Sequence, residues 1–116
     1  MGRVDFEGTK GTLVYRMLYD STKVLIRGML REMETAGAVQ WDSQAELGRE
    51  CLYEMHQMTR PQYKGWRSDG KSHSNGAPEL VKATRAIPFV KSMVSAIRRK
   101  DQASAVISGR AALAEM

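Results

Sequence analysis

The side chains that most often act as a nucleophile, a general base or a soft metal ligand are few and badly spaced for such chemistry. The sequence contains one cysteine and two histidines, Cys51, His56 and His73. Cys51 and His56 are five residues apart, so on one helix they point about 140° away from each other. No phosphate-binding loop, dinucleotide-binding glycine pattern or nucleophile elbow occurs in the sequence. We interpret Cys51 as a small buried residue and predict a non-enzymatic protein that needs no cofactor or metal.

Cations and aromatic rings alternate in a segment rich in glycine and serine between residues 60 and 75. The predicted contact residues there are Arg60, Tyr63, Lys64, Trp66, Arg67 and Lys71. Cationic groups neutralise phosphates, and aromatic faces stack on unpaired bases. A second cluster, Arg98, Arg99 and Lys100, follows further along the chain. Two other interpretations stay open: Trp66 anchors the loop to the core, or the loop is a protein interface, where tryptophan, tyrosine and arginine are favoured.

The positive charge is concentrated in the second half of the chain. The net charge is +5, yet residues 61–100 contain nine basic and only two acidic side chains. Such a block indicates an anionic partner, which is either nucleic acid or an acidic protein surface.

Two rows of like charge repeat at four-residue steps, one basic and one acidic. They are Lys23, Arg27 and Arg31, and Glu46, Glu50 and Glu54. Like charges at this spacing repel along a helix, so we expect the rows to face each other across an antiparallel helix pair. The glutamates could instead hold a divalent metal or contact a separate basic partner.

Helical periodicity dominates the elements that must position these residues, and it predicts an all-α single domain of four to five helices. The expected helices cover 12–36, 43–60, 78–87, 88–100 and 102–114, with a loop over 61–77. Residues 1–11 contain three glycines and predict a short strand or an extended arm. Ser43 and Glu46 match a capping box, Pro88 predicts a kink or break, and Asp101 can cap the last helix.

Methionine is frequent, with eight residues in 116. Most lie on predicted apolar helix faces, including Met17, Met29 and Met33 on the first helix, where thioethers suit irregular core gaps. The alternative is an adaptable methionine-rich face that binds partner helices or a copy of the same chain.

Composition excludes several protein classes. No apolar run approaches the roughly 18 residues of a membrane span, and the first residues lack a secretory signal. A lone thiol fits a reducing compartment, so we expect an intracellular, cytoplasmic protein, including one that a virus encodes.

These observations favour an accessory protein that binds nucleic acid or a nucleoprotein complex through the 60–75 loop and the following basic helix. The alternative is a structural or adaptor subunit whose helices dock into a larger assembly or a homo-oligomer. A third possibility is an inhibitor that covers an acidic surface of another protein, and it would use the same residues as the nucleic-acid-binding protein.

Overall fold

The computed structural model describes the backbone of residues 2–59 and 77–116, and the side chains of residues 16–59 and 78–116. These ranges form four α-helices and no strand: α1 (Gly2–Thr35), α2 (Trp41–Met58), α4 (Ala77–Arg98) and α5 (Gln102–Glu115). The predicted all-α fold is therefore confirmed. The predicted loop contacts from Arg60 to Lys71 lie outside the described residues.

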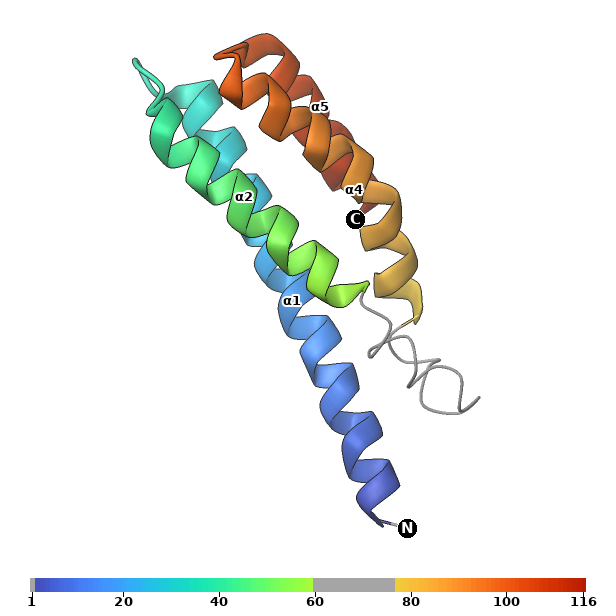
Figure 1. The fold of residues 1–116 in the computed structure, drawn as a ribbon. Coiled ribbons are helices and arrows are strands. Elements are labelled where there is room, and N and C mark those ends of the chain that lie inside the picture. Colours follow the sequence, from blue (N-terminus) through green and yellow to red (C-terminus); the bar gives the residue numbers. More distant parts are fainter. Residues whose placement is uncertain (1, 60–76) are drawn as a thin grey trace.

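The helices form an antiparallel bundle in which each one runs opposite to the helix before it (Figure 1). Extensive contacts join α1 to α2, α2 to α4, α4 to α5 and α5 to α1, whereas α1 and α4 touch much less. The cross-section is thus a ring, with α1 and α4 diagonally opposed. This arrangement lets one apolar stripe of each helix meet the others at the bundle axis.

The core is built from aliphatic side chains, alanines and methionines. Its largest fully buried hydrophobic members are Ile26, Met29, Met33, Met55, Met58, Met93, Val90 and Ile97. The core-filling role is therefore confirmed for these five methionines. On α1 the buried stripe runs through Tyr19, Ile26 and Met33, and Met17 is exposed rather than buried.

Helix α1 is much longer than the bundle that it joins. Its 34 residues span about 51 Å, whereas the 18 residues of α2 span about 27 Å. The N-terminal part of α1 runs past the ends of the other described helices (Figure 1). The predicted extended arm is wrong, because glycine only weakens a helix and adding turns to an existing helix is easier than nucleating one.

Helix α2 begins at Trp41, two residues earlier than predicted. Ser43 therefore lies inside the helix, and Gln40 occupies the N-cap position without a side-chain capping bond. The Glu32 carboxylate of α1 accepts a hydrogen bond from the Gln40 backbone N–H at 3.0 Å instead. The half-buried Trp41 packs against the core. The expected capping box does not form, because tertiary contacts fix the start of the helix.

Pro88 lies inside α4 and does not divide it, which corrects the two predicted helices 78–87 and 88–100. A proline removes the hydrogen bond to the carbonyl four residues earlier, here that of Thr84. Thr84 and Pro88 are both exposed, so water can solvate the freed carbonyl. Within the described ranges the number of helices is therefore four.

The turn between α4 and α5 is tight and fully hydrogen-bonded. The Asp101 N–H donates to the Ala96 carbonyl and the Lys100 N–H donates to the Ile97 carbonyl, each at 2.9 Å. This is the pattern of a Schellman C-cap, in which Lys100 adopts the left-handed conformation, with φ of 59°. The Asp101 side chain then caps α5 by accepting from the Ser104 N–H at 3.2 Å, as predicted.

None of the helices in the described ranges has a stretch of sufficient length and hydropathy to cross a lipid bilayer.

Candidate nucleic-acid interface

The exposed positions of α4 and the turn after it carry most of the described positive charge of the second half of the chain. The exposed cations are Lys82, Arg85, Lys91, Arg98, Arg99 and Lys100, and we call this set the α4 basic surface. The one acidic residue of α4 is Glu79, in its first turn. These cations flank the core stripe of α4: Lys82 and Arg85 lie along one edge, and Lys91 and Arg98 lie along the other, because nine residues correspond to about 180° around a helix.

The two predicted clusters are attached to opposite ends of α4. The described ends of the 60–75 loop are Thr59, after α2, and Ala77, at the start of α4. The cluster Arg98, Arg99 and Lys100 follows the other end, about 33 Å away along the 22-residue helix. Within this interval Lys91 shares one edge of α4 with Arg98, seven residues later, whereas Lys82 and Arg85 lie along the other edge, so one phosphate backbone can follow Lys91 and Arg98 together.

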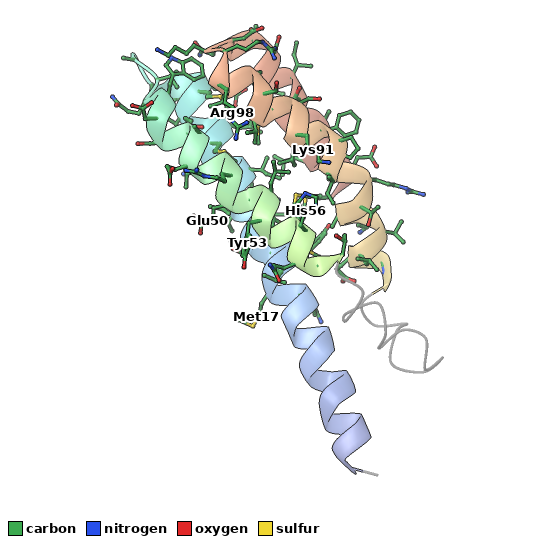
Figure 2. All side chains as sticks on the ribbon, in the orientation of Figure 1. Met17, Glu50, Tyr53, His56, Lys91 and Arg98 are labelled. Carbon is green, nitrogen blue, oxygen red and sulfur yellow. The ribbon has the colours of Figure 1, made fainter. Side chains whose placement is uncertain are left out.

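Few carboxylates neutralise this surface. Among the described residues, Arg99 is the only member with an acidic partner, since its guanidinium lies 3.7 Å from the Asp101 carboxylate. Two hydrogen bonds from Ser104, followed by the charge of Arg99, hold the pKa of Asp101 below its usual value. Lys91 and Arg98 lie with His56 of α2 on the face where α2 and α4 run side by side (Figure 2).

Exposed apolar side chains lie among the cations of α4. Val81 and Phe89 are both accessible, and Phe89 follows the exposed Pro88. An accessible aromatic ring within a positive surface can stack on an unpaired base. Sequence reasoning missed Phe89 because it lies in an apolar run, Ile87 to Val90, that reads as core.

The acidic and basic rows of α2 and α1 do not pair, which corrects the predicted contact. No ion pair within the described ranges joins them: Glu46 binds Arg49 of its own helix, and Arg27 and Arg31 are exposed. The cations of α1 are therefore not neutralised by these glutamates.

Cys51 is fully buried, as predicted, and its thiol lies 3.9 Å from the Thr22 carbonyl. Burial raises the pKa of the Cys51 thiol to about 12, and the carboxylates of Glu54 and Glu50 add to the shift. His56 is exposed on the same helix, and His73 lies outside the described residues. A thiol that stays protonated cannot act as a nucleophile.

We therefore expect Cys51 to resist a thiol reagent at pH 8 in the folded protein and to react on unfolding in urea. Because the folded pKa lies above the unfolded value, the native state holds its proton longer, so stability should fall as pH rises from about 9 toward 12. Urea unfolding across this range measures the loss. A Cys51→Ala variant should lose this part of the pH dependence, and an equal decline in both proteins contradicts the assignment.

A shallow groove of about 640 Å³ lies between α1 and α5. Its lining residues are Met33, Glu34, Gln102, Ala103, Val106, Ile107 and Arg110. The Arg110–Glu34 ion pair spans this groove, so each of these two charges is neutralised by the other. In the part of the chain that the structure describes, no three histidine, cysteine, aspartate or glutamate side chains are grouped to hold a metal ion.

Comparison with known proteins gives no match among protein families, curated sequences or solved structures.

Proposed function

We propose that this protein is a non-enzymatic accessory protein that binds nucleic acid along the α4 basic surface. The observation that carries the proposal is the group of six exposed cations around α4 and its C-terminal turn, of which only Arg99 has an acidic partner among the described residues. Phosphates attract such a surface, and binding releases their counterions.

We propose that the loop residues predicted from the sequence extend the α4 basic surface. Arg60, Lys64, Arg67 and Lys71 add phosphate contacts, and Tyr63 and Trp66 add stacking. The loop joins α4 at its first turn, so the loop and the helix form one continuous stretch of chain.

A binding titration with labelled single-stranded and duplex oligonucleotides at increasing salt tests the proposal. The logarithm of the affinity should fall linearly with the logarithm of salt concentration. Lys91→Gln and Arg98→Gln should each reduce that slope for duplex by about one, because each removes one phosphate contact. Arg16→Gln is the matched control, since Arg16 is exposed on α1, diagonal to α4.

Lys100→Gly separates binding from folding. Glycine removes the cost of the left-handed conformation at this position, roughly 1 kcal/mol, so the variant should melt at a higher temperature. Its affinity for the oligonucleotide should nevertheless fall with the lost cation. If the protein binds no oligonucleotide at 50 mM salt, the proposal is refuted. If it binds polyglutamate as tightly as the oligonucleotides, the partner is an acidic protein surface rather than nucleic acid.

A specific observation also favours the second expected role, a subunit that associates through its helices. Helix α1 exposes two apolar side chains, Met17 and Val24, on the side facing away from the bundle.

A further inference from the structure

Helix α1 has a second apolar face that the bundle leaves uncovered. Met17 is 68% exposed and Val24 is 65% exposed. Each lies nine residues before a fully buried core residue, Ile26 and Met33 respectively, which corresponds to about 180° around the helix. The exposed pair therefore lies directly opposite the core. Met17 and Tyr53 of α2 project from the same side of the bundle in Figure 2.

The spacing along this face is that of a helix-pairing seam. Ser21 lies between Met17 and Val24, and Gly28 follows, so the residues recur at alternating steps of four and three. A β-carbon added at Gly28 would meet no atom within 4 Å. Large and small side chains alternate along the seam, so a copy of the same helix laid antiparallel can place each large residue on a small one.

We propose that this face is the contact with a second copy of the chain, with the two α1 helices antiparallel. Met17 then packs on Gly28 of the second copy, and Val24 packs on Ser21 of the second copy. A two-fold axis repeats both contacts. The proposal goes beyond nucleic-acid binding and does not depend on it, because α4 lies diagonally across the bundle from α1.

The residues that flank the seam fit this register. Leu18 and Leu25 are half-buried on one side, and Asp20 and Arg27 are exposed on the other. In an antiparallel pair, equivalent flanks face each other, so Leu18 meets Leu25 of the second copy and Asp20 meets Arg27 of the second copy. A parallel pair would bring unlike flanks together and set Asp20 against Leu25. Charge complementarity therefore selects the antiparallel arrangement.

The length of α1 supports the same arrangement. Residues 2–15 are helical and extend beyond the other described helices (Figure 1). A single helical segment of this length is marginal in water. In the antiparallel pair, where Met17 is level with Gly28, residues 10–15 run beside residues 30–35 of α1 in the second copy, which gives that part of the segment a neighbouring helix.

Molar mass by light scattering over a range of concentrations tests the contact. The full chain should be a dimer, and Val24→Glu should be a monomer with the same helical content by circular dichroism. Ile107→Glu is the matched control, because Ile107 is 69% exposed on α5, away from this face. A wild-type monomer at hundreds of micromolar, or a dimer that survives Val24→Glu, overturns the proposal.

Charge reversal tests the register. Asp20→Arg places two like charges together twice in each dimer and should weaken it by roughly tenfold or more. Adding Arg27→Asp restores opposite charges and should restore the dimer. If the double variant dimerises more weakly than Asp20→Arg alone, the proposed register is wrong.

Cross-linking tests the direction. A mixture of Met17→Cys and Gly28→Cys chains should form a disulfide-linked pair under mild oxidation. Met17→Cys alone should not, because in the antiparallel pair its two copies lie about 16 Å apart along the axis, beyond disulfide reach. The native Cys51 is buried and does not compete. Efficient self-linking of Met17→Cys would indicate a parallel pair and refute the proposal.

Discussion

Replacing Gly48 with valine is expected to destabilise the protein by about 3 kcal/mol. Gly48 is buried where α2 crosses α4, and a β-carbon there would lie 2.8 Å from Val94 Cγ2. Val94 is β-branched and almost fully buried, so its methyl cannot rotate away without disturbing the core. The two helices must separate instead, which weakens the packing around them. Urea unfolding at fixed protein concentration measures the loss.

A double variant tests whether the loss comes from the steric conflict with Val94. Val94→Ala alone should be destabilising because it leaves a cavity. Combined with Gly48→Val, the Val94→Ala change supplies space for the new side chain. The double variant should therefore lose at least about 1 kcal/mol less free energy of unfolding than the two single variants lose together. Gly37→Val is the control, because a β-carbon at Gly37 meets no atom within 4 Å. Strictly additive losses contradict a direct contact.

Replacing Gln44 with methionine is expected to stabilise the protein by roughly 1–3 kcal/mol. Gln44 is fully buried on α2, and neither its Nε2 nor its Oε1 has a hydrogen-bond partner. An amide buried in this state has lost its bonds to water without replacing them. Methionine has a similar length and flexibility, so it can occupy the same space and remove the desolvation penalty.

The same unfolding experiment tests this expectation. Gln57→Met, at a half-buried position of the same helix, is the control and should change stability by less than about 0.5 kcal/mol. The dependence on urea concentration should be unchanged in both variants, since neither alters the surface exposed on unfolding. A loss of stability in Gln44→Met would show that the amide has a partner in solution.

Much of the fold follows from local sequence signals. The helical spacing of apolar residues predicted an all-α chain, and Asp101 was correctly identified as the cap of α5. The buried state of Cys51 was also predicted, because a lone cysteine without a facing base behaves as a small apolar residue. These features depend on residues a few positions apart along one helix, and such short-range geometry is fixed by the chain itself.

Two of the errors share one cause, which is that contacts between helices decided the outcome. The Ser43–Glu46 capping signal was overridden by Glu32 of α1, which binds the Gln40 N–H. The break predicted at Pro88 did not occur, because the rest of α4 packs continuously on its neighbours while Thr84 and Pro88 face water. A local pattern cannot show which side of a helix its neighbours will cover.

The candidate surfaces show the same division. The sequence by itself determined that the second half of the chain is basic, that Arg98, Arg99 and Lys100 end a helix, and that α1 is rich in apolar residues. Only the tertiary structure decided that the acidic row of α2 leaves the cations of α1 unpaired, and that Met17 and Val24 lie outside the bundle. The physical reason is that a helix with apolar residues around more than half of its circumference has several possible buried faces. Packing against α2 and α5 selects one of them and exposes the other.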